Sequence, residues 1–185
     1  MPEESATRHA RQAGTGGWLQ TLAPAMRLVL QGGPKARAAA GEAFGVALPE
    51  IPCRANSLEY RAALWLGPDE QLLLAPAEDA PILVAGLEAA LTDIAHSLVD
   101  VSQRQITLQV SGPHASAILN AGCPLDLDPA EFPPGMCTRT LLGKADIILW
   151  RTGAAEYRLE VWRSFSDYVS GWLLEAAQDF NVRES

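Results

Sequence analysis

Residues 106–122 read ITLQVSGPHASAILNAG, and residues 27–41 read RLVLQGGPKARAAAG. Each stretch has a strand-like run, then a Gly-Pro turn, then a short alanine-rich helix. A glycine turn between a strand and a helix is also a place where proteins bind phosphate. Because the same turn occurs twice, we interpret it as part of the architecture and not as a ligand loop.

The prolines in these turns support that interpretation. Pro34 and Pro113 are each expected at the first position of a helix, where a missing N–H group does no harm. Proline there also removes a donor that a phosphate would need. Neither GxGxxG nor GxxxxGK[ST] is present in the chain.

The segments around the two turns repeat in the same order. In the first half, strands around the GPDE turn at residues 67–70 precede a helix at 78–94 with Asp79 or Ala80 as its cap. In the second half, HSLVDVS (96–102) leads in, strands follow around the turn at 142–144, and a strand at 156–162 precedes the closing helix at 164–180. Each half therefore reads strand, short helix, strands, long helix.

Period-two and helical spacing predict which residues face the core. Along the last strand, Tyr157, Leu159 and Val161 are expected inside, with Arg158 and Glu160 outside. The residues predicted to line the inner faces of the other elements are Ile106, Leu108 and Val110; Leu83, Leu87, Ala90, Leu91 and Ile94; and Phe165, Tyr168, Val169, Trp172, Leu173 and Ala176. Ser164 and Asp167 have the spacing of a capping box.

Residue pairs in the two halves suggest an internal duplication. Gly33-Pro34 corresponds to Gly112-Pro113, and Leu64-Trp65 corresponds to Leu149-Trp150. We predict an α+β fold, a duplicated single domain over 21–185 with halves at about 26–95 and 96–180 that share one core. Residues 1–20 are predicted to form a flexible arm. Trp18 is either the first core residue or an anchor on a partner chain.

Composition excludes several classes of protein. The chain has 185 residues, 48% of them apolar, and a formal net charge of −8, which argues against nucleic acid as a partner. The three cysteines lack a CxxC motif and are expected to be free thiols in a reducing cytoplasm. No signal peptide and no apolar run of about 20 residues is present, so no membrane partner is expected.

No candidate active site stands out among the reactive residues. The histidines, His9, His96 and His114, have no second ligand at metal spacing. Cys123 and Cys137 are expected to be core residues, and there is no GxSxG motif. The acidic group Asp126, Asp128 and Glu131 lacks a calcium-loop pattern and is interpreted as a solvated loop. We assign no catalytic, cofactor-binding or metal residue.

Two stretches carry a resemblance to known families. Residues 96–180, with LVDVSQRQITLQVSGPHASAILN, CTRTLLGKADIILWR and EYRLEVWRSFSDYVSGWLLEA, resemble the folate-binding domain of the glycine-cleavage T-protein superfamily. SLEYRAALWLGPDEQLLLAP (57–76) is similar to a narrower group, the gamma subunits of heterotetrameric sarcosine oxidases. The resemblance covers residues 26–180 and does not extend to the downstream domain of the T-protein, so independent folate binding is not expected.

The resemblance implies a subunit without catalytic residues. Complexes of that family contain alpha, beta, gamma and delta chains. They demethylate sarcosine oxidatively to glycine, form hydrogen peroxide and pass the one-carbon unit to tetrahydrofolate. FAD, FMN, NAD, tetrahydrofolate and zinc are then expected on the other subunits and none on this chain.

Two other interpretations stay open. A stand-alone folate-binding protein of the T-protein kind, acting in one-carbon transfer or iron–sulfur cluster assembly, would need a pocket with a carboxylate placed to bind the pterin. An unrelated α+β interaction module would need no chemistry. Under the subunit hypothesis, Trp162 is of special interest, because it falls on the outer face of its strand, where an indole needs a cover.

Overall fold

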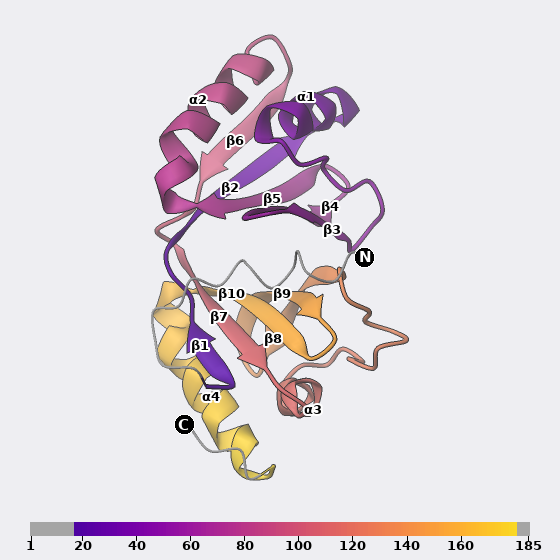
Figure 1. The fold of residues 1–185 in the computed structure, drawn as a ribbon, viewed down its shortest axis with the longest axis vertical. Helices are drawn as coiled ribbons and strands as arrows, with labels where there is room; N and C mark the ends of the chain where they lie inside the picture. Colours follow the sequence, from indigo (N-terminus) through magenta and orange to yellow (C-terminus); the bar gives the residue numbers. More distant parts are fainter. Residues whose placement is uncertain (1–16, 181–185) are drawn as a thin grey trace. The chain divides into compact units, whose positions relative to one another are not determined.

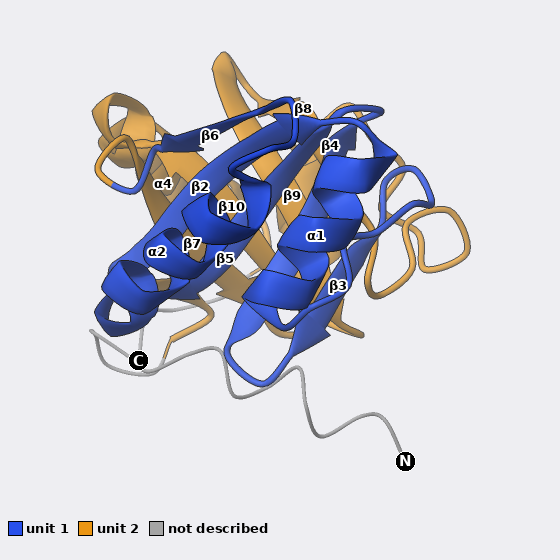
Figure 2. Cartoon of the chain, turned by 90° about the horizontal axis from the view of Figure 1, so that it is seen from above, with its two compact units in different colours: residues 1–9, 24–102 blue, residues 10–23, 103–185 orange. Residues whose placement is uncertain are grey.

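A computed structural model describes residues 17–180 of the chain. The described residues form two compact units, the first from residue 24 to 102 and the second from residue 103 to 180 together with residues 17–23 (Figure 2). Residues 1–16 of the predicted arm lie outside the described residues. Within residues 17–180, no helix is long and apolar enough to span a membrane.

The first unit is a five-stranded antiparallel sheet with two helices on one face (Figure 1). Its strands are β2 (Ala25–Gly32), β3 (Ala55–Leu58), β4 (Arg61–Gly67), β5 (Glu70–Pro76) and β6 (His96–Asp100), in the order β3-β4-β5-β2-β6. The helices are α1 (Pro34–Phe44) and α2 (Ala80–Leu91), and a 3-10 turn at Ala77–Asp79 precedes α2.

The core of the first unit lies between the sheet and these helices. Alternate residues of β2 point into it, because side chains along a strand alternate between the two faces. The residues buried there from β2 and α2 are Met26, Leu28, Leu30, Leu83, Leu87 and Leu91. Ile94 packs against this core, whereas Ala90, predicted on the inner face, is exposed.

Helix α1 begins and ends as its sequence predicts. Gly33 is the N-cap and Pro34 occupies the first turn, where its missing N–H group costs no hydrogen bond. Gly45 ends the helix in the left-handed region at φ 77°. The Arg61 side chain then donates from Nη1 to the Phe44 carbonyl at 3.0 Å, which satisfies one of the last carbonyls of the helix.

The second unit is also a five-stranded antiparallel sheet, in the order β1-β7-β10-β9-β8. Its strands are β1 (Leu19–Thr21), β7 (Gln105–Ser111), β8 (Cys137–Leu142), β9 (Ala145–Gly153) and β10 (Glu156–Trp162). Helices α3 (Ala115–Asn120) and α4 (Ser166–Gln178) cover one face, and a 3-10 turn at Arg163–Phe165 joins β10 to α4 (Figure 1).

A separate core fills the second unit, so the prediction of one shared core is wrong. The central positions of β7, β10 and α4 that line it are Leu108, Val110, Tyr157, Leu159, Val161, Val169 and Leu173. Ile106, Trp172 and Ala176 pack against it, but Phe165 and Tyr168 are exposed. Trp18 also packs against this core, and its carbonyl accepts a hydrogen bond from the Ser111 N–H at 2.7 Å. Of the two alternatives for Trp18, the structure supports the core residue.

The boundary between the units differs from the predicted one. Residues 96–100 were expected to lead into the second half, but they form β6 and pair with β2 of the first sheet. The matching edge of the second sheet is occupied by β1, which pairs with β7. Local sequence could not show this, because either segment can pair with any free strand edge.

The correspondence inferred between Leu64 and Leu149 is also wrong. Leu149 faces the helix-covered core of the second unit, whereas its supposed counterpart Leu64 is absent from the corresponding core, to which β4 contributes Ala63. A shift of one residue in a strand moves every side chain to the other face. The order of the elements was therefore predicted correctly, and their register was not.

Two predicted helix starts need correction as well. Pro113 does not begin a helix: it precedes the N-cap His114 of α3, and Gly112 before it is in the left-handed region at φ 106°. The N-cap of α4 is Phe165, with no side-chain cap hydrogen bond, so Ser164 and Asp167 form no capping box. The 3-10 turn at Arg163–Phe165 places the start of α4 later than the spacing of these residues implied.

Candidate functional site

The histidines and cysteines are placed as structural residues. The ring of His114 stacks on Phe180 at a centroid distance of 5.3 Å, and His96 Nδ1 lies 2.7 Å from the Ile94 carbonyl. Cys123 and Cys137 are buried free thiols, as predicted. Over residues 17–180, no group of three His, Cys, Asp or Glu side chains could hold a metal ion; His9 lies outside that range.

The acidic group in the loop before β8 organises its own backbone. Asp126 Oδ1 accepts a hydrogen bond from the Asp128 N–H at 2.9 Å, and Asp128 Oδ1 accepts one from the Ala130 N–H at 2.9 Å. These carboxylates stabilise turns, because an Asp side chain can accept a hydrogen bond from the backbone N–H two residues further on. The interpretation as a solvated loop is confirmed, because Asp126, Asp128 and Glu131 are all exposed, whereas Leu127 between the two aspartates is buried.

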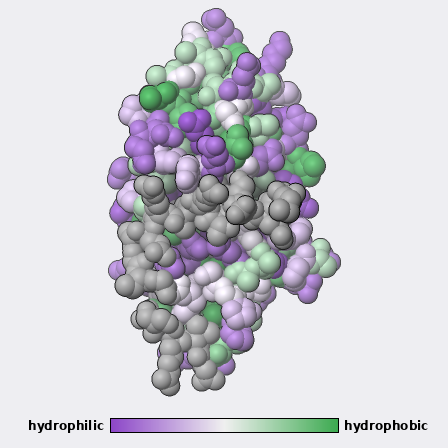
Figure 3. All heavy atoms as spheres, viewed as in Figure 1, coloured by the Kyte–Doolittle hydropathy of each residue, from purple (hydrophilic) through white to green (hydrophobic). Residues whose placement is uncertain are grey.

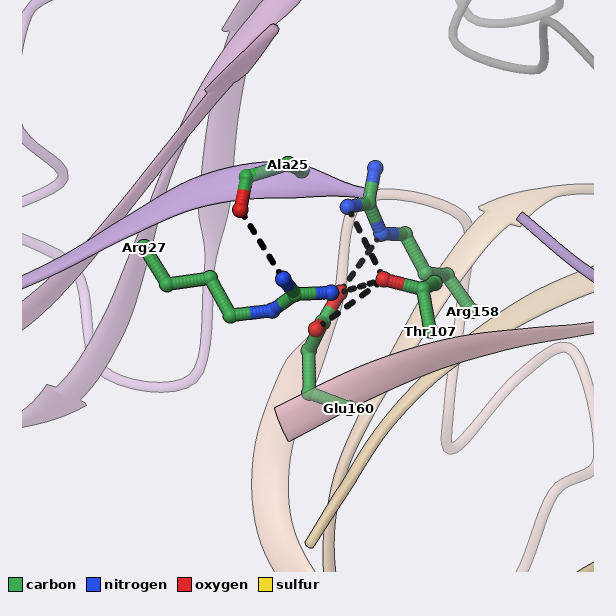
Figure 4. A network of polar contacts seen from close by, with 5 residues as sticks. All are labelled: Ala25, Arg27, Thr107, Arg158 and Glu160. Atoms are coloured by element: carbon green, nitrogen blue, oxygen red, sulfur yellow. Dashed lines mark hydrogen bonds and ion pairs between the residues drawn. The ribbon is translucent and has the colours of Figure 1, made fainter. Parts of the chain in front are cut away.

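A polar cluster lies on the face of the second sheet that α3 and α4 do not cover (Figure 4). Glu160 on β10 pairs directly with Thr107 on β7, whose hydroxyl donates to Glu160 Oε1 at 2.9 Å. Arg158 Nε donates to the same oxygen at 2.7 Å, and its Nη2 lies 3.3 Å from Thr107 Oγ1. Glu160 is 1% exposed and Arg158 is 7% exposed.

This cluster corrects the prediction that Arg158 and Glu160 point into solvent. A buried carboxylate is costly unless it is paired and hydrogen-bonded, and here Arg158 and Thr107 supply both kinds of contact. Arg27 in the first unit is likewise buried, and its Nη1 donates to the Ala25 carbonyl at 3.0 Å. The cluster holds neighbouring strands together.

Another buried guanidinium, that of Arg151 on β9, holds the long loop between α3 and β8. Its Nη1 donates to the carbonyls of Phe132 at 2.8 Å and Leu127 at 3.2 Å, and its Nε and Nη2 donate to Gly153 and Ala154. The guanidinium also lies over the Tyr157 ring, with Cζ 5.1 Å from the centroid. All these acceptors are neutral, so Arg151 acts as a clamp and not as a ligand for an acidic substrate.

Tyr157 extends this clamp to α3. Its hydroxyl lies 2.8 Å from Ser116 Oγ, so strand β10, the loop and α3 are connected through one buried side chain. The residues of both buried groups are thus engaged in contacts that hold the fold. The Thr107 hydroxyl and the Glu160 carboxylate have the chemistry of a nucleophile and a base, but each is only 1% exposed and the two are bonded to each other within the sheet, out of reach of a substrate.

The chain also matches known proteins over most of its length. The model of the sarcosine oxidase, gamma subunit family matches residues 30–179. A sarcosine oxidase subunit gamma from Corynebacterium sp. strain P-1 is 38% identical over 144 residues, which cover 77% of this chain and 70% of that protein. The chain belongs to the sarcosine oxidase gamma subunit family.

Solved structures agree with this membership of the gamma subunit family. A chain in the heterotetrameric sarcosine oxidase from Corynebacterium sp. U-96, in complex with pyrrole 2-carboxylate, matches with a TM-score of 0.83 and 33% identity, over 98% of this chain and 94% of that one. The aminomethyltransferase T of the glycine cleavage system from Bartonella henselae matches with a TM-score of 0.66 and 17% identity, over 84% of this chain and 45% of that one. The second match shows a shared fold only.

For this gamma-family chain, the sequence analysis missed two buried groups, the cluster of Arg158 with Glu160 and the contacts of Arg151. Alternation had placed Arg158 and Glu160 on one face, which is correct, but it could not show that this face is buried. Arg151 had a signal that was not used: it follows the apolar run Ile147–Trp150 within one strand, and a charge in a buried strand needs fixed partners.

Proposed function

We propose that this chain is the non-catalytic gamma subunit of a heterotetrameric sarcosine oxidase, in which it assembles with alpha, beta and delta subunits. The observation that carries the proposal is the match to a chain of such an assembly over 98% of this chain at a TM-score of 0.83. A likeness that spans both units and keeps 33% identity is what a shared subunit role would produce.

The chemistry of the complex then belongs to the other subunits. In this proposal they oxidise sarcosine to glycine, with formation of hydrogen peroxide and transfer of the one-carbon unit to tetrahydrofolate. FAD, FMN, NAD and zinc are bound there, in the cytoplasm. The contacts of Arg151, Arg158 and Glu160 support a structural role for this chain, because groups held by fold contacts are not poised for a substrate.

The folate-binding alternative has weaker support. The fold it shares with the aminomethyltransferase covers less than half of that protein. Such a chain would bind tetrahydrofolate by itself, whereas a gamma subunit would show no binding outside the assembly. Titration of the isolated chain with tetrahydrofolate separates the two proposals.

Co-expression tests the main proposal. The affinity-tagged chain, produced together with alpha, beta and delta subunits of the same source, should recover all three and show sarcosine-dependent peroxide formation. The chain produced alone should be colourless. The proposal would be contradicted if none of the three subunits is recovered, or if the chain alone shows a flavin spectrum.

We also propose that the two units arose by duplication of one α+β unit. Support comes from the strand orders β3-β4-β5-β2-β6 and β8-β9-β10-β7-β1, which place elements of the same rank in the same positions, except at the last edge. In this proposal Leu28 corresponds to Leu108 and Leu73 to Leu159, and each of these residues lies in the core of its own unit. An alignment of many relatives should show matching hydrophobic preferences at these pairs, and a better match at the earlier register would overturn the assignment.

A further inference from the structure

Trp162 ends strand β10 at the surface of the second unit. It lies opposite Gln105 of β7, and its side chain is 40% exposed. On the face of the molecule shown in Figure 3, hydrophobic residues lie in small groups among hydrophilic ones. The Trp162 indole is a candidate for an interaction site, because tryptophan is enriched at interfaces.

Two arginines flank this indole and are held in place. The Arg104 guanidinium lies over the Trp162 ring, with Cζ 4.1 Å from the centroid. Arg163 donates from Nε to the Gln103 carbonyl at 3.1 Å and from its backbone N–H to the Arg104 carbonyl at 2.9 Å. We call Arg104, Trp162 and Arg163 the arginine–tryptophan patch. Its side chains are pre-ordered, which lowers the entropic cost of binding.

The charges of the patch are not neutralised within the described part of the chain. Arg104 and Arg163 are both exposed, and neither forms an ion pair with a described residue. The whole chain nevertheless carries 22 acidic against 14 basic residues. Two unpaired guanidinium groups beside an indole thus form a local basic site on an acidic protein.

We infer that the arginine–tryptophan patch docks a carboxylate-rich segment of another subunit, an inference that rests on the proposed role of the chain in a heterotetramer. Guanidinium groups bind carboxylates through paired, charge-assisted hydrogen bonds. Tryptophan and arginine are the residues most enriched among those that dominate binding energy at interfaces. The partner segment therefore places acidic side chains on Arg104 and Arg163 and an apolar group on the open part of Trp162.

A nucleic acid is the other polyanion that such a patch could bind. The net charge of −8 disfavours it, because phosphate binding needs a broad basic surface, and two arginines do not provide one. Carboxylates on a protein partner need only a local match of charge, which the patch supplies.

The test uses single substitutions in the full chain, co-expressed with alpha, beta and delta subunits. R104E and R163E reverse the charge, and W162A removes the indole. K35E on exposed Lys35 of α1 is the control for the same change in charge, and I82A is the control for loss of an exposed apolar side chain, since Ile82 on α2 is 80% exposed. Circular dichroism and thermal melting of each chain report its folding.

The three patch variants should fold and bind the other subunits more weakly than wild type, by about thirtyfold for W162A and at least about tenfold for each reversal, as expected for central interface residues. Both controls should bind like wild type. Wild-type binding should also weaken toward an ionic strength of about 1 M, where the Debye length is about 3 Å, and this dependence should be smaller in R104E and R163E.

Three outcomes would count against the inference in different ways. If wild type recovers the other subunits and the patch variants bind them equally well, the patch is not the docking site, although the subunit role stands. If wild type recovers none of them, the proposed function itself fails. Loss of co-purifying nucleic acid in the variants, with subunit binding unchanged, would overturn the choice of a carboxylate partner.

Discussion

The hydroxyl of Thr107 on β7 donates a hydrogen bond to the buried carboxylate of Glu160 on β10, its direct partner across the sheet, at 2.9 Å. The two residues are 53 positions apart in the sequence. Together with Arg158, they join two neighbouring strands through a charge that is hidden from solvent.

Replacement of Thr107 by Val should destabilise the chain by about 1–3 kcal/mol, because the buried carboxylate loses a donor. Thr107→Ser keeps the hydroxyl and should cost clearly less. Urea denaturation of both variants measures the difference in the free energy of unfolding. A loss in Thr107→Ser as large as that in Thr107→Val would contradict this expectation, because it would show that the methyl group contributes as much as the hydrogen bond.

Replacement of Arg151 by Met should loosen the loop that Arg151 clamps. The carbonyls of Leu127 and Phe132 would lose a charged donor, and each such hydrogen bond contributes about 1.5–3 kcal/mol. Hydrogen exchange should rise in residues 123–136 more than elsewhere. Arg37→Met is a suitable control, since that arginine donates to the Pro68 carbonyl at an exposed site; similar exchange in both variants would contradict the clamp.

Gly122 leaves room for the indole of Trp172. A Cβ atom at Gly122 would lie 2.5 Å from Trp172 Nε1 and 3.2 Å from the backbone nitrogen of Gly143. Gly122→Ala should therefore lower stability by about 1–3 kcal/mol through overpacking. Gly171→Ala on α4 has nothing within 4 Å and should raise stability by up to about 1 kcal/mol, because alanine favours the helix. Thermal melting of the two variants should shift in opposite directions.

Trp18 and Trp162 should respond differently to truncation. Trp18 packs against the core of the second unit, so Trp18→Ala should cost roughly 2–4 kcal/mol. Trp18→Phe should cost less, because it also removes an indole N–H that is buried without an acceptor among the described residues. Trp162→Ala, at an exposed site, should change stability by less than about 1 kcal/mol. A large loss for Trp162→Ala in urea denaturation would show that its contact with Arg104 holds the fold.

The sequence alone determined the type and the order of nearly all the elements. Strand alternation placed Tyr157, Leu159 and Val161 on one face, and the Gly-Pro pair marked the start of α1, because backbone and packing periods act over a few residues. The family resemblance was equally readable, and the match over residues 30–179 confirms it.

Only the tertiary structure decided which distant residues meet. The edge positions of β1 and β6, the bond between Thr107 and Glu160, and the position of Arg104 over Trp162 all depend on which strands pair and in which register. Alternation tells which side chains share a face, but not what that face contacts. From alternation alone, a charged residue such as Glu160 is therefore predicted to be exposed, because the strand that carries its partner is not known from the local sequence.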